Sequence, residues 1–277
     1  MSALVVSLNR LFRRPNVEGR ESAEAYSAWE HRWGRELVRT YLEPAGDLDG
    51  KTVLDVGCGL GGKTVAYHEA GAKMVVGTDL LAENIAASRE YAQGHAPELE
   101  GAFFASDAAH LPVAPEAFDT VVANDAMEHF ARPEAALEEM ASATRLGGAI
   151  WLFFTPHFSP LGSHLYDYVY TPWCHLLFTR GQLRGAIGRV LRERSPEATE
   201  TEIGASLDEI MTSYDRDLNH MSIRWFLRII RDVSGLDVSY LELRPARFRW
   251  LGWLTRVPIL RELVTGFVIC RLERTAA

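Results

Sequence analysis

The sequence has 277 residues, of which 47% are hydrophobic, enough for one large α/β domain with an insertion or for two small domains. Its formal net charge of −8 argues against a chain built for non-specific binding to nucleic acid. Three widely spaced cysteines form no Cys-x-x-Cys pair, which excludes a zinc knuckle and favours a cytoplasmic protein without a disulfide framework. No apolar stretch approaches the length of a membrane span, so we expect no stable membrane insertion.

Residues 1–50 predict a helical segment at the start of the chain. Four apolar residues recur at i, i+3, i+7 and i+11, the spacing of one face of an amphipathic helix: Tyr26, Trp29, Trp33 and Leu37. We expect Glu43-Pro44-Ala45-Gly46 to end this helix. The helix either covers one edge of a sheet or forms a lid over a cofactor, and Trp33 is a candidate substrate-binding residue.

A glycine-rich turn follows the first predicted strand, Thr52–Val56. The turn is Gly57-Cys58-Gly59-Leu60-Gly61-Gly62, and a helix is expected over residues 63–70. A strand, a glycine turn and a helix N-terminus together let a ligand approach bare backbone. The turn matches both Gly-x-Gly-x-x-Gly and Gly-x-Gly-x-Gly, so by itself it does not separate NAD from other adenosine cofactors.

Strands and helices then alternate as far as residue 155. Four further strands are predicted, at 74–78, 102–105, 118–123 and 149–154. Two helices are predicted between them, one over 82–93 that stops at Gly94 and one over 133–145 that stops at Gly147-Gly148. Strands separated by helices of this length predict right-handed crossovers and a parallel sheet.

Acidic residues follow the ends of several predicted strands. Because the carboxyl ends of parallel strands meet at one edge of a sheet, we expect five carboxylates along that edge: Asp55, Asp79, Asp107, Asp125 and Glu128. A pyrophosphate site would have few carboxylates nearby. The acidic edge therefore favours a cationic cofactor that carries an ammonium group.

Residues 156–217 interrupt the alternation and predict an insertion rich in aromatic residues and histidine. Tyr166, Tyr170 and Trp173 are candidate substrate-binding residues, because aromatic side chains can wall a pocket for a flat or apolar acceptor. Alternatively, the aromatic residues form a small core of the insertion or a dimer contact.

The alternation resumes from residue 218. We predict a helix over 222–233 and strands over 236–243 and 263–272. Between these strands, residues 244–261 are rich in arginine and tryptophan. This segment could contact a membrane surface or an acidic substrate. Alternatively, it is a solvated hairpin or an oligomer contact.

In combination, these motifs resemble those of class I S-adenosylmethionine-dependent methyltransferases of the small-molecule, methyltransferase type 11-like kind. Six segments carry the resemblance in order and spacing: 53–61, 76–79, 106–112, 118–122, 127–130 and 146–148. The resemblance implies an α/β Rossmann-like, doubly wound, seven-stranded sheet, mostly parallel with an antiparallel last strand, and a helical insertion after the fifth strand. Four parts are then expected: an N-terminal helical cap (1–50), a cofactor-binding core (51–155), a substrate-cap insertion (156–217) and the completion of the core sheet (218–277).

The resemblance also implies S-adenosyl-L-methionine as the cofactor, S-adenosyl-L-homocysteine as the product, and a set of cofactor-binding residues. The glycines meet the methionine portion and the ribose, Asp79 the ribose hydroxyls, Leu80 the adenine ring, and Asp107 the adenine amino group. Alternatively, Asp55 only caps the turn and Asp107 is a helix N-cap. The full set is Asp55, Gly57, Cys58, Gly59, Gly61, Asp79, Leu80, Asp107, Ala108 and Asn124.

Methyl transfer from a sulfonium needs a general base only when the acceptor must lose a proton early. His157 follows the fifth strand and is the first candidate base. His129 is the second, although it could simply brace its loop. His164, His175 and His220 are weaker candidates. No metal is expected, because His157, His164 and His175 have no fixed ligand spacing.

We therefore expect a biosynthetic enzyme of specialised metabolism that methylates a small organic molecule, on oxygen before nitrogen or carbon. Its partner would be the small-molecule substrate, with no nucleic acid, and a homodimer is allowed. Three rivals remain: a dehydrogenase, disfavoured by the acidic strand edge; a methyltransferase acting on lipid, RNA or protein; and a binder of the same fold with non-methylating chemistry. Net charge and the lack of an Asn-Pro-Pro-Tyr-type stretch disfavour RNA and protein as acceptors.

Overall fold

The computed structural model describes residues 2–9, 11–12, 22–246 and 249–276. The chain divides into two compact units. The core unit comprises Glu18–Phe154, Trp225–Glu242 and Ile269–Ala277, and the insertion unit comprises Met1–Val17, Thr155–Arg224 and Leu243–Val268. These boundaries differ from the predicted ones, because the beginning of the chain and residues 243–268 group with the insertion and not with the sheet.

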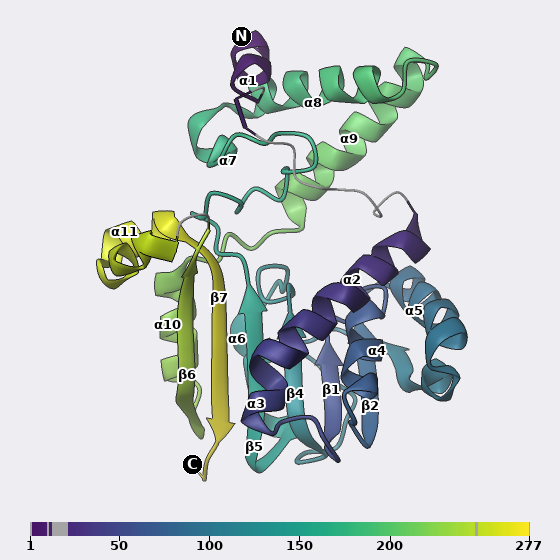
Figure 1. Ribbon diagram of the computed structural model, residues 1–277, viewed down its shortest axis with the longest axis vertical. Helices are drawn as coiled ribbons and strands as arrows, with labels where there is room; N and C mark the ends of the chain where they lie inside the picture. Colours follow the sequence, from purple (N-terminus) through teal and green to yellow (C-terminus); the bar gives the residue numbers. More distant parts are fainter. Residues whose placement is uncertain (1, 10, 13–21, 247–248, 277) are drawn as a thin grey trace. The chain divides into compact units, whose positions relative to one another are not determined.

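Within the described residues, one seven-stranded sheet has the order β3-β2-β1-β4-β5-β7-β6 (Figure 1). Its strands are β1 (Thr52–Val56), β2 (Met74–Asp79), β3 (Phe103–Ala105), β4 (Phe118–Asn124), β5 (Thr144–Phe154), β6 (Leu236–Pro245) and β7 (Thr265–Arg274). The first five strands pair in parallel. β6 and β7 form an antiparallel hairpin, since Thr275 N–H bonds the Gly235 carbonyl and Ala246 N–H bonds the Val264 carbonyl. The predicted sheet is confirmed, including its antiparallel last strand.

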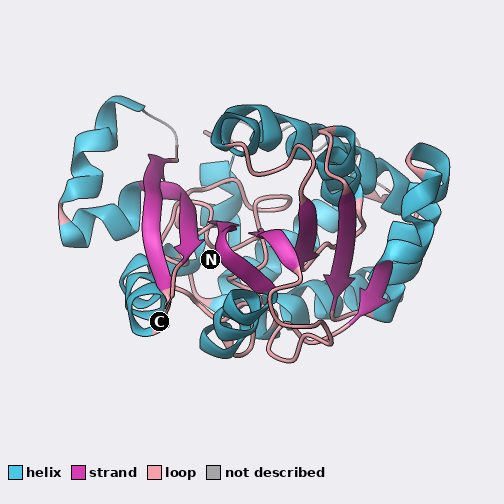
Figure 2. Ribbon diagram, turned by 90° about the horizontal axis from the view of Figure 1, so that it is seen from below, coloured by secondary structure: helices cyan, strands magenta, loops and turns pink. Residues whose placement is uncertain are grey.

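Helices cover both faces of this sheet (Figure 2). The helices that group with the core unit are α2 (Ala23–Leu37), α3 (Glu43–Ala45), α4 (Gly62–Glu69), α5 (Ala82–His95), α6 (Pro133–Ala143) and α10 (Ile223–Asp232). A π-helical turn, Val38–Leu42, joins α2 to α3, and a 3₁₀ helix, Pro97–Ala102, precedes β3. α2, α4 and α5 pack on one another. The Trp225 indole bonds Glu134, which joins α10 to α6.

Two predicted boundaries are wrong. α5 continues through Gly94 to His95 and ends ahead of Pro97, because a proline, not the glycine, disfavours helical backbone before it. α6 ends at Ala143, and β5 already begins at Thr144, where it pairs with Phe118. The register then shifts before Ala149, so the glycines expected to end the helix form an irregularity inside the strand.

The apolar stripe predicted to be the buried face of α2 is also only partly correct. Leu37 is buried, but the three aromatic residues of the stripe are half-buried. The buried face instead carries Ser27, Glu30, His31, Gly34 and Leu37. The reason is close packing on α4: a Cβ at Gly34 would lie 3.0 Å from the Cβ of Ala66. Small and polar residues therefore face inward, and the aromatic residues lie at the margin of the contact.

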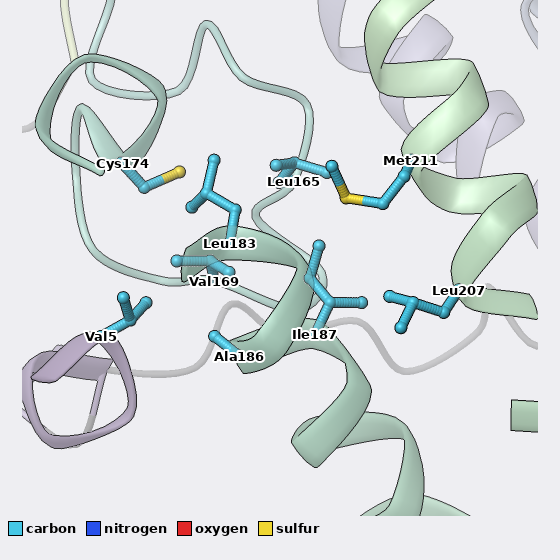
Figure 3. Close-up of a cluster of buried hydrophobic side chains, with 9 residues drawn as sticks. All are labelled: Val5, Leu165, Val169, Cys174, Leu183, Ala186, Ile187, Leu207 and Met211. Atoms are coloured by element: carbon cyan, nitrogen blue, oxygen red, sulfur yellow. The ribbon is translucent and has the colours of Figure 1, made fainter. Parts of the chain in front are cut away.

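The insertion unit has a small apolar core of its own. Its helices are α1 (Ser2–Asn9), α7 (Cys174–Leu177), α8 (Arg180–Arg194), α9 (Glu200–Arg216) and α11 (Pro258–Val264), with a 3₁₀ helix at Arg249–Arg256. Figure 3 shows nine buried side chains of this core gathered around α8: Val5, Leu165, Val169, Cys174, Leu183, Ala186, Ile187, Leu207 and Met211. Residues 249–256 and 258–264 are helical, which excludes the predicted hairpin there, and Arg247 of the predicted segment lies outside the described residues.

Asn9 fastens α1 to this unit. Its buried side chain donates to the Tyr168 carbonyl at 2.9 Å and accepts the backbone N–H groups of Tyr170 and Thr171 at 2.6 and 3.1 Å. One side chain thus replaces the missing partners of three backbone groups in a loop. This contact between residues far apart in sequence explains why the first residues group with the insertion.

Candidate functional site

The glycine turn at the carboxyl end of β1 is the centre of the site. Gly57, Gly59 and Gly61 have φ of 77°, 56° and 81°, a region that favours glycine. A Cβ at Gly57 would lie 2.6 Å from the Cβ of Ala126, and one at Gly61 would lie 2.9 Å from the Cβ of Ser88. Both backbone conformation and space therefore require glycine at these positions.

Asp79 holds this turn to the end of β2. Its Oδ2 accepts the Gly59 N–H at 3.0 Å, and its Oδ1 accepts the Leu81 N–H at 3.0 Å and the Asn84 amide at 2.9 Å. The carboxylate is half-buried and faces the edge of the sheet. The neighbouring Leu80 side chain is 69% exposed, so a flat ligand ring could pack on it.

Asp107 closes the turn that follows β3. Its Oδ1 accepts the Ala109 N–H at 2.9 Å, and its Oδ2 accepts from the Arg132 guanidinium at 3.1 Å. These two bonds lower the pKa of Asp107, the backbone bond having the larger effect. Ala108, which lies between Asp107 and Ala109 in the chain, is buried. Asp107 therefore has a structural role in its own turn, and it lies after β3 where the sequence placed it.

Asp55 lies beneath the turn and is fully buried. Its Oδ2 accepts the Thr64 hydroxyl at 2.6 Å, which ties β1 to α4. Burial raises the pKa of Asp55 to about 6, although Thr64 and the nearby Lys63 oppose the rise. Burial, with the carboxylates of Asp55 and Asp79, also raises the pKa of the Cys58 thiol well above its usual value. Asp55 and Cys58 therefore lie on the buried side of the turn.

Two charged residues that the sequence analysis did not select complete the site. The buried Lys63 ammonium donates to the Asn124 carbonyl at 3.0 Å and to Asp125 Oδ2 at 3.1 Å, and lies 3.7 Å from Glu30 Oε1. Burial opposes its charge, but Asp125 and Glu30 raise the pKa of Lys63 well above its ordinary value. Lys63 had one signal: it is one of only three lysines, and it follows the glycine turn directly.

Glu30 reaches the turn from α2. A Cβ at Gly59 would lie 3.3 Å from Glu30 Oε1, so the carboxylate lies against the backbone of the turn. Burial raises the pKa of Glu30 to about 7, and the attraction of Lys63 only partly offsets this. Its position could not be read from the sequence, because α2 reaches the turn only through tertiary packing.

The residues around the turn fit a ligand that donates hydrogen bonds or carries positive charge. Two buried acceptor atoms there have no hydrogen-bond partner among the described residues, Glu30 Oε2 and Asn124 Oδ1. Orphaned buried acceptors are costly and call for a donor. Together with the carboxylates of Asp79 and Asp125, they suit an ammonium or a sulfonium and would repel a pyrophosphate.

Comparisons with known proteins agree with this chemistry. Residues 54–152, which run from β1 into β5, match a protein family described as "Methyltransferase domain". An uncharacterized methyltransferase of Mycobacteroides abscessus is 27% identical over 228 residues, which cover 82% of this chain and 77% of that relative.

Two solved structures are similar to this fold. The first is a geranyl diphosphate C-methyltransferase from Streptomyces coelicolor A3(2), in complex with Mg²⁺, geranyl diphosphate and S-adenosyl-L-homocysteine, with a TM-score of 0.53, 15% identity, and coverage of 88% of this chain and 77% of that chain. The second is a magnesium protoporphyrin IX methyltransferase from Synechocystis PCC 6803 with bound SAH, with a TM-score of 0.51, 18% identity, and coverage of 96% and 92%. Residues 54–152 therefore form a methyltransferase domain, and the fold is that of class I S-adenosylmethionine-dependent methyltransferases. Its cofactor is S-adenosylmethionine.

The two candidate bases of the methyltransferase belong to different units. His129 is exposed in the core unit, in the loop after β4, where its N–H bonds the Ala126 carbonyl at 2.9 Å. His157 lies in the insertion unit among two other histidines, its ring centroid 5.0 Å from that of His175 and 4.5 Å from that of His220. Burial and these neighbours lower the pKa of His157 to about 4, and His175 donates to the His157 carbonyl at 2.6 Å.

The candidate substrate residues are likewise divided. Trp33 is half-buried on α2 of the core unit, and the other three are half-buried in the insertion unit. Tyr170 accepts a bond from Arg194 at 3.1 Å, and the Trp173 indole donates to the Leu263 carbonyl at 3.0 Å. The ring centroid of Tyr166 lies 6.2 Å from that of His164. Two further aromatic residues of the insertion, Tyr168 and Phe178, pack against the apolar core, as the alternative interpretation expected.

A hollow of about 300 Å³ elsewhere in the core unit lies away from this chemistry. It is bounded by residues before β4, at the end of α6, at the end of α10 and at the end of β7, among them Glu116, Ser142, Asp232 and Arg274. These positions lie at the amino ends of the parallel strands, opposite the glycine turn.

Proposed function

We propose that this methyltransferase methylates a small organic acceptor, on oxygen in preference to nitrogen or carbon. The observation that carries the proposal is the ring of acceptor groups around the glycine turn. Directly after β5, the chain enters a separate unit with its own apolar core. A dedicated unit that begins at the carboxyl edge of the sheet is suited to selecting a substrate.

We further propose how the chain would hold its cofactor. The backbone of Gly57 to Gly61 would meet the methionine portion, and Asp79 would accept from the ribose hydroxyls. Glu30 and the Asn124 side chain would accept from the ammonium, and Lys63 would attract the methionine carboxylate. When bound, S-adenosylmethionine supplies a methyl group that its sulfonium already activates, so the protein positions the acceptor and excludes water.

For an acceptor that loses a proton, the two histidines remain the proposed bases. His157 is neutral at physiological pH because its pKa is about 4, so it is free to take a proton, although it is a weak base. With a phenolic acceptor, loss of the true base should lower kcat by about a hundredfold or more. We would compare His157→Asn with His129→Asn over a pH series. If His157 is the base, the wild-type rate falls only as the pH approaches 4, and His157→Asn abolishes that dependence.

The test of the proposed function is a search for product. The enzyme would be incubated with S-adenosylmethionine and a panel of phenols, amines and carboxylic acids, with formation of S-adenosylhomocysteine and of a methylated product followed by mass spectrometry. Because the similar solved structures include enzymes named for geranyl diphosphate and magnesium protoporphyrin IX, the panel should contain an isoprenoid diphosphate and a porphyrin. Methylation confined to RNA, protein or lipid would refute the proposal.

The remaining expectations about the cell are proposals as well. We place the enzyme in the cytoplasm, where its three buried cysteines, which form no disulfide, would stay reduced. We propose no nucleic-acid partner, in keeping with the net charge of −8. No helix in the described part of the chain is both long enough and apolar enough to cross a membrane.

A further inference from the structure

Exposed apolar side chains gather in two segments of the insertion unit. In residues 253–263, Trp253 is 60% exposed and Ile259 is 77% exposed. In residues 158–177, Leu177 is 61% exposed. Nine large apolar side chains of these two segments are exposed in all: Phe158, Leu161, Leu176, Leu177, Trp253, Val257, Ile259, Leu260 and Leu263, which we call the apolar face. A patch of exposed apolar side chains often marks an interaction surface, whereas single exposed apolar residues do not.

Two hydrogen bonds place the segments side by side. The Trp173 indole, at the start of α7, donates to the carbonyl of Leu263 in the last turn of α11 at 3.0 Å. The backbone N–H of Trp173 also donates to the Pro160 carbonyl at 3.0 Å. The leucines of α7, Leu161 and the end of α11 therefore adjoin one another, and the apolar face is one surface.

The exposure does not come from a loose helix. The Glu262 carboxylate of α11 accepts the backbone N–H groups of Ile223 and Arg224, which belong to the same unit, at 2.9 and 2.8 Å. On α11, Ile259, Leu260 and Leu263 lie within about one third of the helix circumference. The polar side of α11 is thus fastened to the unit, and its apolar side points away from it.

The charge of residues 244–263 indicates which kind of partner fits the apolar face. Residues 244–263 contain five arginines and a single acid, Glu262, which already accepts the two backbone N–H groups, whereas the whole chain has a net charge of −8. The arginines are Arg244, Arg247, Arg249, Arg256 and Arg261. Arginine interleaved with tryptophan and branched apolar residues suits an anionic lipid surface. A second copy of the chain fits less well, because a two-fold contact would bring like charges together.

We propose that the apolar face docks this methyltransferase reversibly on anionic membranes, with the α7 and α11 side chains in the headgroup region and the exposed Arg256 against lipid phosphates. The association is peripheral, in keeping with the absence of a membrane-spanning helix from the described residues. The inference goes beyond the proposed function and does not depend on the identity of the acceptor.

Vesicle flotation with the full chain tests the proposal. Vesicles of phosphatidylcholine alone would be compared with vesicles that also contain phosphatidylglycerol, at low and high salt. We expect binding to the anionic vesicles that high salt weakens. Ile259→Asp should weaken it about tenfold, the order expected for losing one buried aliphatic side chain. Arg256→Gln, which removes an exposed arginine, should weaken it about fivefold.

Matched controls come from the core unit. Leu146→Asp changes a leucine that is 55% exposed on β5, and Arg231→Gln removes an exposed arginine of α10. Both should leave vesicle binding unchanged, and all variants should keep the thermal stability and the S-adenosylmethionine affinity of the wild type. The proposal is overturned if the wild type does not float, or if Ile259→Asp floats like the wild type. It is also overturned if Ile259→Asp instead converts a dimer to a monomer in light scattering.

Discussion

Glu30→Gln should make the protein more stable at alkaline pH. The carboxyl group of Glu30 is buried over the glycine turn, and its pKa is raised from 4.5 to about 7. The folded state therefore prefers the protonated form. The stability that this preference contributes is fully present below pH 4.5 and is lost as the pH rises through about 7.

The magnitude follows from the same two pKa values. A rise from 4.5 to about 7 corresponds to about 3 kcal/mol of unfolding free energy. Glutamine has the shape of the protonated acid and does not ionise. The unfolding free energy of Glu30→Gln should therefore equal that of the wild type near pH 4.5 and exceed it by about 3 kcal/mol at about pH 8.

Urea denaturation followed by tryptophan fluorescence, at several pH values between these limits, measures the difference. Glu36→Gln is the matched control, since it makes the same change at an exposed position of the same helix. Buried Asp55 adds a dependence in the same direction in every variant, and it cancels in the comparison. If Glu30→Gln and the wild type differ by the same amount at all pH values, Glu30 does not titrate as argued.

The same substitution should have the opposite effect on cofactor binding. A cationic ligand near Glu30 favours its ionised form, so wild-type affinity for S-adenosylmethionine should rise as the pH increases through about 7. Glu30→Gln should flatten this rise and bind about tenfold more weakly at about pH 8. Calorimetry that shows parallel pH profiles for the two proteins would contradict a contact between Glu30 and the cofactor. Residues at functional sites commonly lower the stability of the folded protein because they serve ligand binding.

Three further substitutions test other parts of the site and the fold. Asp79→Asn should weaken S-adenosylmethionine binding about tenfold by calorimetry, through lost charge-assisted hydrogen bonds; unchanged affinity would remove Asp79 from the site. Lys63→Met should lower the unfolding free energy by about 3 kcal/mol, since it leaves buried acids without their cation. Adding Glu30→Gln to this variant should recover part of the loss. If it does not, Lys63 and Glu30 are not coupled. Asn9→Ala should lower the stability of the insertion unit by about 3 kcal/mol in hydrogen exchange and leave cofactor affinity unchanged; a loss of affinity would contradict the independence of this contact from the site.

The parts of the site that could be predicted from the sequence are those made by neighbours along the chain. The glycine turn, Asp79 at the end of β2 and Asp107 after β3 follow from strand ends and turn chemistry, and the parallel pairing of the first five strands follows from the helical crossovers between them. Glu30 lay on a helix whose predicted buried stripe was aromatic. Close packing against Ala66 selected the small and polar stripe instead, and no local pattern encodes that choice.

The boundaries that the sequence misplaced have a similar origin. Gly147 and Gly148 are ordinary helix stops in isolation, but pairing with β4 draws Thr144 into the sheet and makes the glycines part of a strand irregularity. The grouping of α1 with the insertion depends on Asn9, whose partners lie about 160 positions later in the sequence. Contacts of this range leave no periodicity to read.

The position of α2 decides between the two interpretations of the N-terminal helix. The Ser27 hydroxyl donates to the Leu60 carbonyl at 3.0 Å, and a Cβ at Gly62 would lie 2.0 Å from the Ser27 carbonyl. Arg35 forms two bonds of 2.8 Å with Glu69 of α4. A lid that swings open would have to break all of these contacts, so α2 would act as a fixed wall of the proposed cofactor site. A fixed wall explains why an acid with a perturbed pKa is carried on this helix, because only a rigid element can hold a buried carboxylate over the turn before the cation arrives.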